Sequence, residues 1–141
     1  MKFLALAFCL ICFPTWAQST NDAVTQQNIR STICVSGWTK TVRPPTAFTN
    51  KLKRQEMTAA KIPLDQASKY ELDHQIPLAL GGAPRDPKNL HLQLWIGPDG
   101  AHAKDAEERR MQLEVCAGKI TLTHARACMA VDWHLCAGLT Q

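Results

Sequence analysis

The sequence predicts a small α+β protein with one β-hairpin, three or four helices and long connections, stabilised by disulfides. The chain has 141 residues, which is enough for one domain with a modest core. Leu90, Leu92 and Leu94 alternate with polar residues, a period of two that is typical of a strand. The cysteines outside the first residues are even in number, as expected of a chain that forms disulfides.

The first 17 residues have the pattern of a secretory signal peptide. Lys2 is a short positive head, residues 3–13 are apolar, and residues 15–17 offer a cleavage site. The apolar run is shorter than the roughly 20 residues that span a bilayer. A buried N-terminal helix is the alternative, and the position and charge asymmetry of the segment disfavour it. We therefore expect residues 1–17 to be removed and the protein to be exported, either periplasmic or secreted.

Four cysteines remain after loss of the predicted signal peptide: Cys34, Cys116, Cys128 and Cys136. In an oxidising compartment they would form two disulfides, for which three pairings exist. We favour Cys34–Cys116, which would join the N-terminal arm to a later helix, with Cys128–Cys136, which would close a short loop. A zinc site is the competing use of four cysteines, and the absence of a C-x-x-C spacing disfavours it.

The remaining segments are read in chain order. Residues 18–32 are polar without a clear period and are expected to form a flexible N-terminal segment, before a single domain over 33–141. Residues 33–35 are a short strand candidate. A helix is expected over about 48–60, and a last one over about 122–133.

The centre of the chain predicts a hairpin followed by a helix. Residues 70–80 form the first strand, and Gly81-Gly82 is a turn signal. Residues 90–95 return as the second strand, which residues 97–100 end. Residues 101–117 then read as a helix.

Asp73 and His74 are the most informative pair in the first strand. A histidine acts as a general base near neutral pH, and a carboxylate is a hard ligand for a divalent cation. Neighbouring strand residues point to opposite faces, so both serve one site only if the strand bends or ends there. Pro77, three residues after His74, favours such an ending. A surface pair without function is the alternative.

The predicted helix adds further candidates. His102 and Glu108 lie about 60° on either side of Asp105, so the three form one ridge. Lys104 and Arg109 surround this ridge with positive charge that suits phosphate oxygens. A solvated helix face with ordinary ion pairs is the alternative interpretation.

Five segments, in this order, carry a family resemblance: Cys34–Pro44, Tyr70–Gly82, Asp86–Leu90, Lys104–Glu108 and Val115–Ile120. They read C-x-x-G-W-T-x-x-V-R-P, Y-E-L-D-H-x-I-P-L-x-L-G-G, D-P-x-N-L, K-D-x-x-E and V-C-x-G-x-I. The chain resembles the HNH (His-Me finger, ββα-metal) endonucleases, and more closely their small exported bacterial branch. The resemblance spans nearly all of the chain after the signal peptide and implies a ββα-metal core.

The resemblance also implies roles for individual residues. His74 would be the general base that activates water, Asp73 a metal ligand, and Asn89 the residue that steadies the loop carrying the base. Asp105 and Glu108 are favoured as further ligands of one divalent metal ion, either Mg, Mn or Zn. Many HNH proteins place asparagine or histidine on this helix, and His102 is the substitute ligand here.

The implied activity is hydrolysis of phosphodiester bonds in DNA, or in RNA, with low sequence specificity. The net charge of +4, or +3 once Lys2 is lost, is a mild excess that supports a polyanionic partner only weakly. We expect a monomer that does not associate with a membrane after signal cleavage and that an inhibitor or immunity protein would bind.

One alternative is an exported binding module that keeps this scaffold without catalysis. Another is a metal hydrolase of a cell-wall or lipid phosphate ester.

Overall fold

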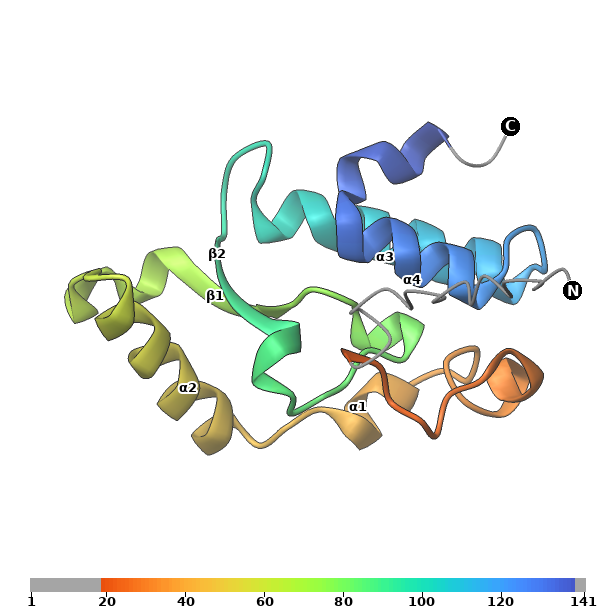
Figure 1. Ribbon diagram of the computed structural model, residues 1–141, viewed down its shortest axis with the longest axis horizontal. Coiled ribbons are helices and arrows are strands. Elements are labelled where there is room, and N and C mark those ends of the chain that lie inside the picture. The colour runs from red at the N-terminus through yellow and green to blue at the C-terminus, as the bar shows by residue number, and fades with distance from the viewer. Residues whose placement is uncertain (1–18, 139–141) are drawn as a thin grey trace, which may run out of the picture.

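The computed structural model describes residues 19–138, so the predicted signal peptide at 1–17 lies outside the described residues. The described part is a mixed α+β structure in which a two-stranded hairpin is flanked by helices (Figure 1). Its helices and strands, in chain order, are α1 (Trp38–Val42), α2 (Thr46–Ala59), β1 (Tyr70–His74), β2 (Leu90–Leu94), α3 (Ala101–Cys116) and α4 (Leu122–Val131).

The hairpin pairs β1 and β2 antiparallel, with Tyr70 opposite Leu94 and His74 opposite Leu90. The apolar pattern predicted a first strand up to residue 80, with an ending near Asp73 and His74 favoured by Pro77. The strand ends at His74. The chain then turns into a 3-10 helix over Leu78–Leu80. Pro77, at the start of this turn, has no N–H to donate to a strand ladder. Residues 75–89 therefore form a long connection in place of a tight glycine turn.

The helices confirm three predictions closely. The helix expected over 48–60 is α2, which begins two residues earlier and packs against both strands (Figure 1). The helix expected over 101–117 is α3. The last predicted helix is α4, and the Thr121 side chain caps its first turn by accepting from the His124 N–H. None of the described helices combines the length and apolar character needed to cross a bilayer.

The N-terminal segment differs from its prediction. Residues 18–32 were expected to be flexible, but Val24 and Ile29 are buried and residues 26–31 form a 3-10 helix. The strand candidate at 33–35 is wrong. The N–H of Cys34 donates to the Ile29 carbonyl at 3.0 Å, so this backbone forms local turns and pairs with no neighbouring strand.

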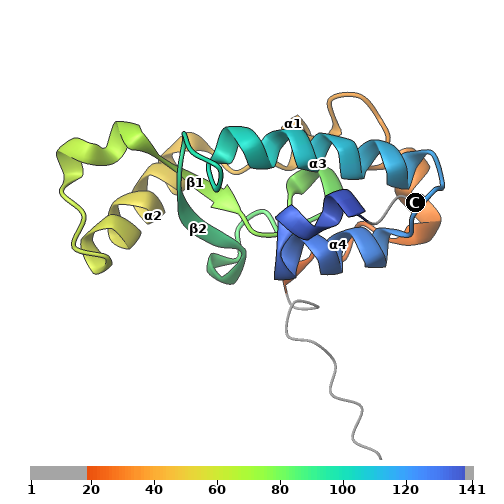
Figure 2. The same cartoon turned by 90° about the horizontal axis from the view of Figure 1, so that it is seen from above.

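The main core lies between α3, α4 and the connection after β1. Figure 2 shows α3 and α4 side by side, and their apolar faces enclose Ile76 and Leu80. Both predicted disulfides are confirmed. Cys34–Cys116 joins the segment before α1 to the end of α3, and Cys128–Cys136 closes the C-terminal turn.

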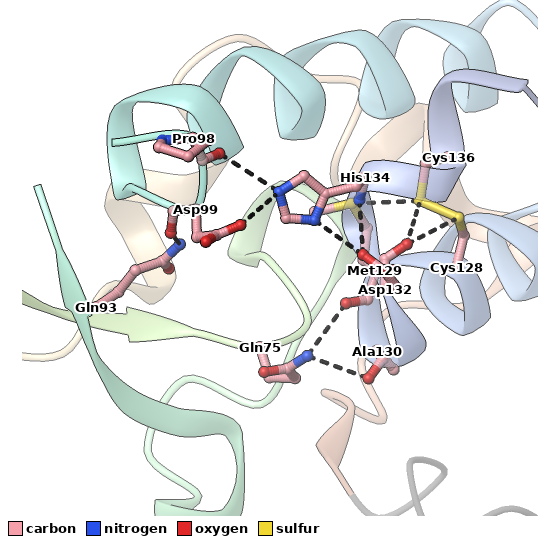
Figure 3. A network of polar contacts seen from close by, with 10 residues as sticks. All are labelled: Gln75, Gln93, Pro98, Asp99, Cys128, Met129, Ala130, Asp132, His134 and Cys136. Atoms are coloured by element: carbon pink, nitrogen blue, oxygen red, sulfur yellow. Dashed lines mark hydrogen bonds and ion pairs between the residues drawn. A yellow bond between two sulfur atoms is a disulfide. The ribbon is translucent and has the colours of Figure 1, made fainter. Parts of the chain in front are cut away.

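Figure 3 shows how the C-terminal segment is attached to the rest of the fold. The His134 ring contacts the carboxylate of Asp132 at 2.9 Å and that of Asp99 at 3.0 Å. The hydrogen bond that the His134 ring donates to the Asp132 carboxylate raises the pKa of His134. In the same view, the Gln75 side-chain amide donates to the carbonyls of Met129 and Ala130. The connection after β1 is thereby fixed against the end of α4.

Candidate active site

His74 ends β1 as a buried side chain with a defined tautomer. Its Nε2 lies 3.1 Å from the carbonyl oxygen of Pro84, which can only accept a hydrogen bond. Nε2 therefore carries the ring proton, and Nδ1 is the basic nitrogen. Burial lowers the pKa of His74, against the opposite effect of this hydrogen bond and of Asp73. The ring is thus neutral near pH 7, as a general base must be.

Asn89 fixes the connection that follows His74. Its side chain is fully buried, and its Oδ1 accepts from the Ile76 N–H at 2.8 Å. Its Nδ2 donates to the carbonyls of Ile76 and Ala83, both at 3.0 Å. A Cβ at Gly82 would lie 1.8 Å from the Ile76 carbonyl oxygen, so only glycine fits beside this contact. These bonds hold residues 76–83 in one arrangement.

Lys104 lies beneath the site and joins α3 to β1. Its Nζ donates to Asp73 Oδ2 at 2.7 Å, to Glu108 Oε1 at 2.6 Å and to the His74 carbonyl at 2.8 Å. These three acceptors use all three N–H groups of the ammonium. Burial lowers the pKa of Lys104, but Glu108 and Asp73 outweigh it and raise the pKa overall. The Lys104 ammonium is therefore charged and held in place.

Four carboxylates line one cavity of about 510 Å³, together with His74: Glu71, Asp73, Asp105 and Glu108. Burial, followed by repulsion from neighbouring carboxylates, raises the pKa of Glu71 to about 7. The pKa of Glu108 is also raised to about 7, mainly by burial and against the lowering effect of Lys104. The cavity thus gathers more negative charge than Lys104 balances.

Another part of the cavity wall comes from α1 and the segment between α1 and α2. Trp38 and Arg43 line it, and the Cys34–Cys116 disulfide holds their segment against α3. Arg109, which is exposed on α3, lines the same cavity. The charge of Arg43 lowers the pKa of both Glu71 and His74, although burial is the larger influence on each. Two arginines therefore line the cavity together with the carboxylates.

The structure brings most of the sequence-predicted site residues together. His74, Asp73, Asp105, Glu108 and Arg109 all line the cavity. Two other predictions need correction.

Lys104 was predicted to bind phosphate, but its side chain is only 2 % exposed and its donors are occupied. His102 was the substitute metal ligand, but it does not line the cavity and its ring centroid lies 5.2 Å from that of Trp95.

Two cavity residues, Glu71 and Arg43, were not singled out in the sequence. The sequence does contain a pattern that could have identified Glu71. It precedes Asp73 by two residues on β1, so the two side chains lie on the same face of the strand. Arg43 belongs to the V-R-P segment that the resemblance includes. Its approach to His74 depends on how that segment packs, which no local pattern encodes.

The donor set fits a divalent cation that prefers hard ligands. Carboxylate oxygens suit Mg²⁺ or Mn²⁺ better than Zn²⁺, which favours nitrogen and sulfur. Asp73 and Glu108 each use one oxygen on Lys104, so each has a second oxygen. Within residues 19–138, no three His, Cys, Asp or Glu side chains already form a metal-binding group.

Comparisons with protein-family models, with curated proteins and with solved structures found no match to this chain. The resemblance to HNH endonucleases therefore rests on the sequence motifs alone. The function is argued below from the chemistry of the cavity.

Proposed function

We propose that this protein is an exported, metal-dependent endonuclease of the HNH type that hydrolyses phosphodiester bonds with low sequence specificity. One observation carries the proposal: a buried, neutral histidine shares a cavity with four carboxylates and two arginines. The order of hairpin and helix, β1–β2–α3, is the one expected of a ββα-metal core and so supports the proposal. The two disulfides are compatible with an oxidising compartment outside the cytoplasm.

In the proposed mechanism His74 is the general base. Its Nδ1 takes a proton from water, and the water oxygen bonds to phosphorus as the P–O bond to the leaving oxygen on the opposite side breaks. The leaving oxygen then takes up a proton from solvent. The Pro84 carbonyl holds the ring tautomer through Nε2. Asp73, with Asp105 and Glu108, would hold a divalent cation that supplies stabilisation of the developing negative charge. Lys104 orients Asp73 and Glu108 for that role.

The substrate would be bound mainly through its phosphates. Arg43 and Arg109 line the cavity, and arginine matches phosphate oxygens through paired donors. Contacts of this kind read no base sequence and weaken as salt is raised. DNA is the proposed substrate, with RNA as the second. The monomeric state and the inhibitor or immunity partner remain predictions.

A plasmid-nicking assay of the oxidised protein tests this function. Magnesium, manganese and zinc are supplied separately, and EDTA is the control. We expect nicking with magnesium or manganese, loss of nicking in EDTA, and weaker nicking at high salt. Cation binding without cleavage of DNA or RNA would select the non-catalytic binding module. Hydrolysis of other phosphate esters, with DNA and RNA uncut, would select the alternative hydrolase.

A further inference from the structure

A second cavity of about 270 Å³ adjoins the first on the α2 side of the hairpin. Arg43, Glu71 and His74 line both cavities, so the two meet beside the proposed general base. A phosphodiester placed at His74 would therefore have space on either side of it. The first cavity contains the acidic cluster, and the proposed function leaves the second without a role.

One wall of the second cavity is a polar stripe on α2. Thr46, Thr49 and Asn50 line it at spacings of three and four residues, which place them on one helix face. Asn50 offers both a donor and an acceptor through its amide. Lys53 lies further along the same stripe, but its ammonium is held by the carbonyls of Ala67 and Tyr70. The wall therefore offers neutral hydrogen-bonding groups rather than a free lysine.

The other side of the second cavity is apolar and aromatic. Leu72 and Trp95 line it, and the Trp95 ring lies beside the His102 ring at 5.2 Å. The backbone N–H of Trp95 donates to the Lys69 carbonyl at 3.0 Å, and this bond fixes the backbone at Trp95. An aromatic side chain and neutral polar groups in one cavity suit a nucleobase and its sugar. The second cavity, at about 270 Å³, is close to the lower end of the range for small-molecule sites, roughly 300–1,000 Å³. This volume suits a single nucleoside.

We propose that the second cavity binds a nucleoside directly flanking the scissile phosphate, with Asn50 and Thr46 as its hydrogen-bonding partners and Trp95 as its apolar contact. This inference rests on the proposed function, because it places the scissile phosphate at His74. It makes the substrate a polynucleotide strand that crosses from one cavity to the other.

Fluorescence anisotropy with a labelled single-stranded DNA oligonucleotide tests the inference. All proteins carry His74→Ala, so that bound DNA is not cut, and magnesium is present. Asn50→Leu removes the amide at nearly constant size, and Gln55→Leu makes the same kind of change at an exposed α2 residue that lines neither cavity. We expect Asn50→Leu to weaken binding about tenfold, since the bound nucleoside loses its partner. Gln55→Leu should change binding less than twofold.

Thr46→Val is a second probe in case Asn50→Leu does not fold, and it should also weaken binding, by about threefold to tenfold. Equal affinities for the Asn50 and Gln55 variants, or no binding of the oligonucleotide by any protein, would overturn the inference. The plasmid-nicking assay reports separately on the proposed function. A protein that binds through Asn50 and never nicks would refute the nuclease and retain the nucleoside site.

Discussion

At the scale of single residues, burial changes what a charged side chain does. Lys104 was interpreted from the sequence as a phosphate-binding residue, because it lies among other cations on a helix. In the structure it is enclosed, and its three N–H groups hold Asp73, Glu108 and the His74 carbonyl. The sequence placed a lysine on this helix, but it did not predict that the lysine is buried, because its burial depends on the packing of α3 against β1.

Replacing Lys104 with methionine should therefore cost stability. Removing one partner of a buried ion pair leaves an uncompensated charge, at a cost of about 3–5 kcal/mol. Chemical denaturation of the purified protein measures this loss. Lys51→Met, at an exposed residue of α2, is the matched control and should change the free energy of unfolding by less than about 0.5 kcal/mol. Equal costs for the two variants would contradict the buried role of Lys104.

The raised pKa values of Glu71 and Glu108 predict a pH effect. Each carboxyl has a pKa of about 7 in the folded protein, against an ordinary value of 4.5. The folded state therefore binds more protons than the unfolded state between these values, and stability falls as pH rises through this window. A divalent cation that binds the ionised carboxylates would offset the loss.

Melting temperatures at pH 5 and pH 8, with and without magnesium, test this. Magnesium should raise the Tm more at pH 8 than at pH 5, and Glu71→Gln should reduce the pH dependence. Equal magnesium effects at both pH values would contradict the prediction.

At the scale of elements, strong local patterns predicted the structure well. The alternating leucines predicted the strand that the structure contains as β2. The helices α2, α3 and α4 lie within a few residues of their expected bounds. The strand predicted at 33–35 is replaced by local turns. The segment 18–32, which was expected to be flexible, is held in its described part by distant partners. For example, Asn21 donates to the Gly81 carbonyl, and Thr20 pairs with Gly82. A polar segment without a period gives no indication of such contacts.

The two disulfides should contribute unequally to stability. Cys34 and Cys116 are 82 residues apart, whereas Cys128 and Cys136 are 8 apart. Loop-closure entropy gives about 4–5 kcal/mol for the longer loop and about 2–3 kcal/mol for the shorter one. Replacing each pair with serine and measuring chemical denaturation should reproduce this order. A larger loss for the Cys128–Cys136 pair would contradict the expectation from loop length.

At the scale of the whole molecule, the candidate site is assembled from three parts of the chain. β1 supplies Glu71, Asp73 and His74, α3 supplies Asp105 and Glu108, and the segment before α2 supplies Arg43. The motifs identified most of the residues on β1 and α3. Their meeting in one cavity, and the approach of Arg43, follow from tertiary packing and the Cys34–Cys116 disulfide, which periodicity does not specify.

The central claim is that His74 activates water beside a cation held by carboxylates. Plasmid nicking by His74→Ala, compared with His124→Ala at an exposed residue of α4, tests it most directly. We expect His74→Ala to nick at least about 100-fold more slowly, the usual contribution of a general base, and to keep the circular dichroism spectrum and Tm of a folded protein. His124→Ala should nick at the normal rate. Full activity of a folded His74→Ala protein would contradict the account.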